Sequence, residues 1–471
     1  MHELWLSVAL LITCILPATN AQTAQDGHLR SIDWEHYQAQ AVRLLQDYLR
    51  IDTSNPPGNE LAAAEFFHRL FDQAGIPNKV YPYAPGRANI LARLKGDGSL
   101  RPMILLNHTD VVQTDPSTWR VPPFSGDIVN GEIYGRGAVD MKEEGLIQAM
   151  VLIIAAREHL PLQRDLIFLA TADEEVGNTG SAWMIQNHPE LLRGAEFLIT
   201  EGGANLSHEG RGNVYGVGVG EKAPCWIRMT ATGRGGHGSM PIADSAPNRL
   251  ARAMRRVADW ETPIHLLPGV ERYFHELAQL QPEPRASQFR NIRQSLQDPA
   301  FVRWLSEDSD LDNMLRDTVS LTVIKAGTQT NVIPDTAYCE LDVRLLPGSN
   351  PEEFLRQIRA VVADEHVEIK PINPFRAPNA SSADTALYRT IEAVVRQLDP
   401  RAVVLPELNK GYTESQMYRQ LGIACYGFGP EVMTPEIEAT QHAANERMPV
   451  EQVRRGLRLL YEIVARTVNT P

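Results

Sequence analysis

Seven side chains that could bind metal ions or transfer protons are spread over much of this chain. They are His108, Asp110, Asp140, Glu174, Glu175, Glu201 and His442. Five of them stand shortly after one of three apolar runs of strand length, residues 103–107, 166–170 and 197–200. In parallel sheets, ligands collect at the carboxyl ends of the strands. We therefore predict that these side chains meet at one edge of a sheet.

Asp140 lies in the stretch Gly135-Arg136-Gly137-Ala138-Val139-Asp140-Met141-Lys142, just before an apolar helical run. An aspartate in this position is, taken alone, typical of a helix N-cap. Each of the other acids, taken alone, could equally be a solvated loop carboxylate. The metal interpretation depends on finding all seven side chains in comparable positions.

The composition of the group suits two metal ions. One imidazole and one terminal carboxylate for each ion, with one carboxylate shared, form a nitrogen and oxygen ligand set of the kind that zinc prefers. We assign His108 and Glu201 to one ion and Glu175 and His442 to the other, with Asp140 bridging them. Two ions ~3.5–4 Å apart can hold a water molecule between them and polarise a carbonyl group under attack.

Two of the seven residues are expected to act beside the ligands. Asp110 stands two residues after His108, so both face the same side if the strand continues, and Asp110 could accept the free N–H of that imidazole. Glu174 is adjacent to the ligand Glu175 and is placed to take a proton from a bridging water and pass it to a leaving amine.

Composition limits the class of protein. With 471 residues, 43% hydrophobic and 22% charged, the chain can form two or three globular domains. The net charge of −13 argues against a nucleic-acid partner, which would require a basic face. Cys225, Cys339 and Cys425 are too widely spaced for a disulfide framework or a thiolate metal site.

The first 21 residues resemble a signal peptide. Leu6 to Leu16 is an apolar core, and small residues up to Ala21 form a cleavage pattern, although no basic residue precedes the core. We expect export to the periplasm or the medium, and no membrane contact after cleavage. An uncleaved anchor is the alternative, but the apolar run is short for a membrane span. A lipoprotein site at Cys14 is weaker still, because the apolar run continues beyond it.

Strands and helices alternate along most of the chain, which predicts an α/β fold with a mainly parallel, two-sided sheet. Residues 28–216 and 375–471 are expected to form one catalytic domain. Residues 217–374 change to alternating strands and amphipathic helices, so we expect a smaller α+β domain inserted there. Within it, residues 266–316 are charged and irregularly helical, and the sequence does not indicate their role.

These motifs together resemble the co-catalytic zinc peptidase family, whose members include aminoacylase, carboxypeptidase G, carboxypeptidase S, acetylornithine deacetylase and succinyl-diaminopimelate desuccinylase. The resemblance extends over essentially the whole mature chain. The motifs that carry it are His108-Thr109-Asp110, residues 135–142, Asp173-Glu174-Glu175, Glu201-Gly202-Gly203 and His442. It implies a zinc-exopeptidase-like domain interrupted by a lid or dimerisation domain, the ligand set above, Glu174 as general base, and a cis peptide bond between Asp140 and Met141.

The resemblance also implies residues that contact the substrate. His237, in a glycine-rich loop of the inserted domain, looks like a lid histidine that stabilises the oxyanion, often from the partner subunit of a homodimer. Asn331 and Arg344 resemble residues that hold a substrate carboxylate, although Arg344 could instead form a surface ion pair with Asp342 or Asp335. Thr413 is expected to contact substrate too, but its neighbours depart from the usual family pattern.

We therefore expect an exported dizinc hydrolase that cleaves an amide bond next to an amino acid with a free carboxylate. Its substrate would be a C-terminal peptide bond, a dipeptide or an N-acyl-amino acid, and Co²⁺ or Mn²⁺ could replace Zn²⁺. One alternative is a dedicated metabolite deacylase of the acetylornithine deacetylase type. A catalytically silent binding protein is the other, which the presence of Glu174 and every ligand disfavours.

Overall fold

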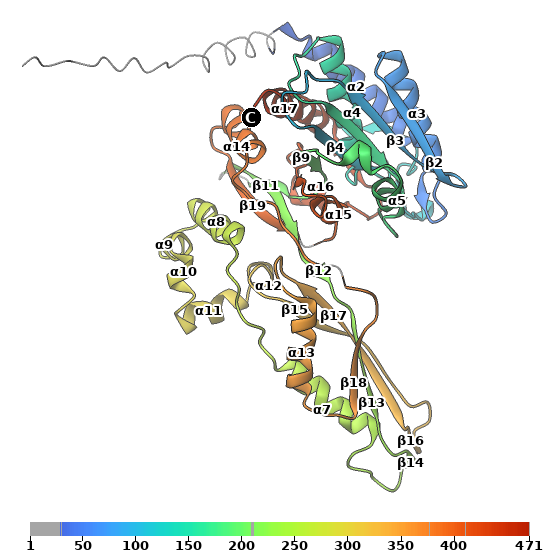
Figure 1. Cartoon of the computed structure of the whole chain (residues 1–471), viewed down its shortest axis with the longest axis vertical. Coiled ribbons are helices and arrows are strands. Elements are labelled where there is room, and N and C mark those ends of the chain that lie inside the picture. Colours follow the sequence, from blue (N-terminus) through green and yellow to red (C-terminus); the bar gives the residue numbers. More distant parts are fainter. Residues whose placement is uncertain (1–28, 30, 209–211, 376, 410, 471) are drawn as a thin grey trace, which may run out of the picture.

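The computed structural model of the protein describes residues 29, 31–208, 212–375, 377–409 and 411–470. The expected signal peptide, residues 1–21, lies outside the described residues. The chain forms a large α/β domain and a smaller domain that extends away from it (Figure 1). Among the described helices, none is long and apolar enough to cross a membrane.

The large domain is built on a nine-stranded mixed sheet, which confirms the α/β class. Its order is β10-β11-β20-β9-β4-β8-β3-β2, with β19 paired to β11. The bounds are β2 Asn78–Ala84, β3 Arg87–Leu94, β4 Met103–His108, β8 Leu166–Thr171, β9 Phe197–Thr200, β10 Asn205–His208, β11 Gly212–Glu221, β19 Val403–Asn409 and β20 Ala424–Gly427. The centre is parallel, because β4 pairs in parallel with β8 and β9, and β9 with β20. Antiparallel pairs β2–β3 and β10–β11 complete the edges.

Apolar side chains of the central strands alternate between two buried faces. Met103 and Leu105 of β4 belong to one core cluster, and Ile104 and Leu106 belong to the other. The first face is covered by α2 Trp34–Leu49, α3 Glu60–Gln73, α4 Lys142–Arg157, α14 Ala386–Leu398 and α17 Val450–Thr467. The second is covered by α5 Thr179–Asn187 and α15 Ser415–Arg419. A period of two in the strands therefore gives a two-sided sheet.

The smaller domain has a five-stranded sheet in the order β12-β17-β13-β18, with β15 paired to β17. Its strands are β12 Ala223–Pro224, β13 Ile227–Thr232, β15 Thr318–Ala326, β17 Thr336–Leu345 and β18 Val367–Pro371. Helices α7 Ala246–Ala258 and α13 Pro351–Val362 share one apolar cluster with this sheet. The inserted α+β domain is therefore present, with helices on one face of an antiparallel sheet.

Two features of residues 217–374 differ from the expected division. Residue 217 lies inside β11, which belongs to the large sheet, so the smaller sheet begins only at β12. Helix α8 Pro268–Leu277 packs on β19 and β11 of the large sheet, where Tyr273 and Leu277 contact Val214, Val403 and Leu405. The apolar pattern continues through Gly220 into β12, so it does not mark the change of sheet. The helical segment after α7 therefore covers the edge of the large sheet.

Candidate metal centre

The candidate ligands come from the ends of three neighbouring strands. Strands β9, β4 and β8 lie side by side in parallel. His108 is the last residue of β4, and Glu201 and Glu175 follow the carboxyl ends of β9 and β8 respectively. Asp140 immediately precedes α4, and His442 comes from the loop before β21 Arg447–Pro449. The ends of three parallel strands thus bring Glu201, His108 and Glu175 together at one edge of the sheet.

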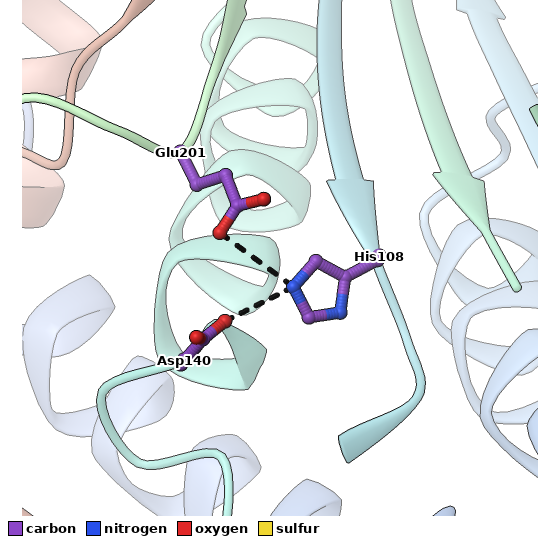
Figure 2. A group of neighbouring side chains, drawn as sticks. All are labelled: His108, Asp140 and Glu201. Atoms are coloured by element: carbon purple, nitrogen blue, oxygen red, sulfur yellow. Dashed lines mark hydrogen bonds and ion pairs between the residues drawn. The ribbon is translucent and has the colours of Figure 1, made fainter. Parts of the chain in front are cut away.

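The side chains form two groups that share one residue. His108 Nε2 lies 3.0 Å from Asp140 Oδ1 and 3.7 Å from Glu201 Oε2 (Figure 2). His442 Nε2 lies 3.0 Å from Asp140 Oδ2 and 3.2 Å from Glu175 Oε1. Asp140 thus presents one carboxylate oxygen to each group. Within each group the potential ligand atoms all lie within 4.8 Å of one another, a spacing that suits a metal ion.

The donor types fit a pair of divalent cations. Each group offers one imidazole nitrogen and two carboxylate oxygens, a set suited to zinc and to related first-row metals. His108 and Asp140 are buried, so their orientation is fixed by the surrounding structure. His442 is partly exposed, which leaves a way in from solvent.

The clustered carboxylates shape the protonation of the site. Although burial lowers the pKa of His108, the carboxylates of Glu201, Asp110 and Asp140 raise it well above its usual value. Hydrogen bonds to Asp140 and Glu175 raise the pKa of His442 to about 10. Burial, together with the charge of Glu201, raises the pKa of Glu174 well above the usual range. The metal-free site therefore holds protons that cations would have to displace.

Metal binding at neutral pH is expected to release protons. The neighbouring carboxylates favour the protonated form of both imidazoles when no cation is bound, because they raise the pKa of His442 to about 10 and also raise that of His108. Ligating imidazoles must be neutral, so we expect about two protons released per chain from the two histidines and an affinity that rises with pH up to about 10. Calorimetry in buffers of different ionisation enthalpy measures the proton count. A pH-independent affinity would contradict this assignment.

Asp140 is held in place by residues that the sequence analysis did not single out. Glu446 Oε1 accepts the main-chain N–H groups of Val139 at 2.8 Å and of Asp140 at 3.1 Å. Arg136 forms a buried ion pair with Glu446 at 2.5 Å, and Gln441 Nε2 donates to Asp140 Oδ2 at 2.7 Å. The Asp140–Met141 bond is cis, as the resemblance implied. The available signal was proximity, because Gln441 and Glu446 flank His442 in the sequence.

Asp110 lies against both His108 and the loop that carries the two glutamates. The acceptor at hydrogen-bond distance from His108 Nδ1 is the main-chain carbonyl of Asp110, at 3.0 Å, whereas its carboxylate lies 3.6 Å away. Strand β4 ends at His108, so the alternation that would place both side chains on one face stops there. The Asp110 carboxylate instead accepts the main-chain N–H groups of Glu174 at 3.0 Å and Glu175 at 3.1 Å. It therefore orients the loop that carries both glutamates.

A second buried network supports the same loop. Asn55 Nδ2 donates to Asp110 Oδ2 and to Asp173 Oδ1, both at 2.8 Å. Arg87 Nη1 pairs with Asp173 Oδ1 at 2.8 Å and with Glu60 Oε1 at 2.9 Å. Because charges this deeply buried are costly without partners, the network fixes one arrangement of the loop. Arg87 and Asn55 had no motif signal of their own in the sequence.

Four predicted residues stand apart from the two ligand groups. His237, in β14 Gly236–His237, is exposed, and β14 lies with β16 Val332–Ile333 at the far end of the smaller domain (Figure 1). Asn331 is exposed beside it, with its main-chain carbonyl accepting Gly238 N–H at 2.8 Å. Arg344 pairs with Asp342 at 2.8 Å, the alternative that its sequence context allowed. Thr413 is buried and donates to Glu221 Oε1 at 2.8 Å.

Comparisons with known proteins agree with this geometry. A family model described as Peptidase family M20/M25/M40 matches residues 104–466. The N-fatty-acyl-amino acid synthase/hydrolase PM20D1 of Xenopus tropicalis is 29% identical over 462 residues, covering 95% of this chain and 90% of that protein. Aminoacylase-1 of Dictyostelium discoideum is 26% identical over 447 residues, covering 91% and 97% respectively.

Solved structures of low sequence identity share the fold. An M20 family metallo-carboxypeptidase of Sulfolobus solfataricus has a TM-score of 0.67 at 17% identity, covering 91% of this chain and 99% of that one. The YXEP protein of Bacillus subtilis, described as a dinuclear metal binding peptidase from the M20 family, has a TM-score of 0.57 at 13% identity, covering 93% and 100%. Both likenesses extend over the large and the smaller domain.

Proposed function

This chain belongs to peptidase family M20/M25/M40, and from that membership we propose that it is an exported dizinc enzyme that hydrolyses N-acyl-amino acids. The broader assignment, a metal-dependent hydrolase of the peptidase and aminoacylase type, follows from the family and its relatives. One observation carries the narrower proposal: two nitrogen and oxygen ligand groups share Asp140, and Glu174 stands beside them at the same edge of the sheet.

The chain supplies a base for the reaction. His108, Asp140, Glu175, Glu201 and His442 would hold two zinc ions, which when bound would polarise the scissile carbonyl and lower the pKa of a bound water molecule. Glu174 takes a proton as the water oxygen bonds to the carbonyl carbon, and returns it to the nitrogen as the C–N bond breaks. The high pKa that burial and Glu201 give this carboxyl in the metal-free protein indicates a group able to hold a proton. Asp110 keeps the main chain of Glu174 in position meanwhile.

Two kinds of observation support the substrate class and the location. Two relatives that match nearly the whole chain are named as an N-fatty-acyl-amino acid synthase/hydrolase and as an aminoacylase. These names favour N-acyl-amino acids over peptides as the proposed substrates. Export rests on the apolar run Leu6 to Leu16 and the small residues that follow it. N-terminal sequencing of protein from the periplasm or the medium tests export. A mature chain that still starts before residue 21 would count against it.

Hydrolysis with and without a chelator tests the proposed activity. The purified protein, loaded with Zn²⁺, is expected to release ninhydrin-positive amine from N-acyl-amino acids, to lose this activity in chelator, and to regain it when zinc is returned. Metal removal takes away the polarising charge, so the loss should reach several orders of magnitude, about 10³-fold or more. The proposal would be rejected if the chelator left the rate of amine release unchanged, or if no amide released any amine.

His237 is proposed to act from a second copy of the chain. Its Nδ1 accepts the main-chain N–H of Ser239 at 3.1 Å, so the neutral ring carries its proton on Nε2 and can donate to an oxyanion. Because β14 lies at the far end of its own smaller domain, the donor would reach the site of a partner subunit (Figure 1). The family resemblance supports a homodimer through this domain.

Complementation between two inactive variants tests the shared site. Glu174→Gln and His237→Ala chains should each be nearly inactive alone. In a mixed dimer, the His237→Ala chain provides Glu174 and receives the imidazole of the other chain, so one site is complete. Random mixing is expected to restore about a quarter of wild-type activity, because half of the dimers are mixed and each has one working site. No recovery in dimers shown to be mixed would reject the shared site.

A further inference from the structure

A hollow lies where the chain crosses between the two domains. We call it the hinge pocket, and its volume is ≈ 530 Å³. Its wall on the large domain is formed by residues 176–178, directly after Glu175, and by Tyr412. Its wall on the smaller domain is formed by Pro224, Trp226 and residues 373–375. The volume falls within the range that encloses a ligand of drug size, about 300–1,000 Å³.

The pocket is lined by apolar side chains that remain open to solvent. Val176 is 63% exposed and Trp226 is 43% exposed. Phe375 and Tyr412 are half-buried beside them. Large apolar groups left exposed together in a concave site indicate a binding surface more often than a chance arrangement.

None of the described residues that line the pocket is acidic or basic, although 22% of the chain is charged. Its side-chain polar groups are the amides of Asn178 and Asn373, the indole N–H of Trp226 and the hydroxyl of Tyr412. A charged group entering this pocket would lose water without gaining an opposite charge, which is costly. The pocket therefore favours an uncharged chain over the free ammonium group of a dipeptide.

Direct contacts join the hinge pocket to the candidate catalytic groups. Val176 follows the candidate ligand Glu175, and Asn178 Nδ2 donates to the main-chain carbonyl of Glu174 at 3.2 Å. On the opposite wall, Trp226 Nε1 donates to Asp342 Oδ1 at 3.1 Å, and the same oxygen accepts Arg344 Nε at 2.8 Å. The pocket therefore borders the loop that carries Glu174 and Glu175.

We propose that the hinge pocket binds the acyl chain of an N-acyl-amino acid, so that medium and long acyl groups are preferred to acetyl. This inference rests on the proposed function and adds the chemistry of the acyl group. The volume favours an acyl chain over the side chain of a single amino acid, because it is large enough for a whole drug-sized ligand. The residues that contact the acyl chain, and so determine the specificity, are Trp226, Val176 and Phe375.

A series of N-acyl-leucines with acyl chains of two to twelve carbons tests the proposal on the zinc-loaded full-length enzyme. We expect kcat/KM to rise about fourfold for each added methylene until the pocket is filled, as full burial of a methylene group would give. Trp226→Gln, which removes the ring and keeps an N–H donor, should lower the dodecanoyl-to-acetyl ratio of kcat/KM at least tenfold. Val176→Asp should lower it further by placing a carboxylate in the pocket.

Val129→Asp is the matched control, because Val129 is 38% exposed but lies outside the pocket. It should leave the ratio at the wild-type value. Calorimetric binding of dodecanoate gives a readout that does not need turnover, and Trp226→Gln should weaken it at least tenfold. A flat wild-type series, or equal ratios in wild type and Trp226→Gln, would overturn the proposal. Failure to hydrolyse any amide would instead reject the proposed function. The binding of dodecanoate would then still show whether the hinge pocket binds an acyl chain.

Discussion

Replacing Glu174 with glutamine is expected to lower kcat by about 10²- to 10⁴-fold while the metal content stays at the wild-type level. Glutamine has almost the same shape but cannot take a proton from water. Glu174 belongs to neither of the two ligand groups, so its loss should not remove a metal ligand. Its main-chain N–H would still donate to Asp110, which keeps the loop in place. Steady-state kinetics together with elemental analysis of metal measure both effects.

Glu190→Gln is the control for this experiment, because that carboxylate is exposed and lies in a helix away from the strand ends. It should change neither kcat nor the metal content. Turnover by Glu174→Gln within tenfold of wild type would show that another group moves the proton. Loss of metal in the same variant would show instead that Glu174 is a ligand.

The central sheet could be predicted because each of its strands carries its own signal. Met103–His108, Leu166–Thr171 and Phe197–Thr200 are short runs of apolar residues bounded by polar ones, which is typical of strands buried on both faces. Side chains that can bind metal or transfer protons stand at the ends of these three strands. They could be expected to meet, because neighbouring parallel strands have their carboxyl ends at the same edge of the sheet. The gathering of His108, Glu175 and Glu201 is thus a consequence of local patterns.

The domain boundary could not be predicted in the same way. Val217 and Val219 of β11 face the core of the large domain, whereas Ile227 and Met229 of β13 face that of the smaller one. Both pairs show the same alternation in sequence. Which sheet a strand joins depends on its distant partner, Val403–Asn409 in one case and Thr336–Leu345 in the other.

Residues that act through buried contacts were equally hidden. Glu446 and Arg87 look like ordinary surface charges in the sequence, and charged residues are mostly exposed. Only the fold brings Glu446 under the main chain of Asp140 and Arg87 against Asp173. His237 is the opposite case, because its glycine-rich motif made it a candidate in the sequence. The motif did not indicate that His237 would lie at the far end of the smaller domain.

Replacing Asp140 with asparagine is expected to damage both metal positions at once. Its two carboxylate oxygens face different groups, Oδ1 toward His108 and Oδ2 toward His442, and asparagine offers one neutral oxygen in their place. We therefore expect fewer than one metal ion per chain, against two in the wild type, and a fall in kcat/KM of at least about 10³-fold. Elemental analysis and kinetics of the same preparation measure the two quantities.

Glu201→Gln separates the shared ligand from a terminal one. Glu201 belongs to one group only, with Oε2 at 3.7 Å from His108 Nε2, so its loss should empty one position and leave the group of Glu175 and His442 intact. Circular dichroism of both variants shows whether the fold persists, since Arg136 and Glu446 still hold the main chain at residue 140. If Asp140→Asn bound as much metal as Glu201→Gln, the carboxylate would not bridge two ions, and the two groups would have to be assigned to separate, independent sites.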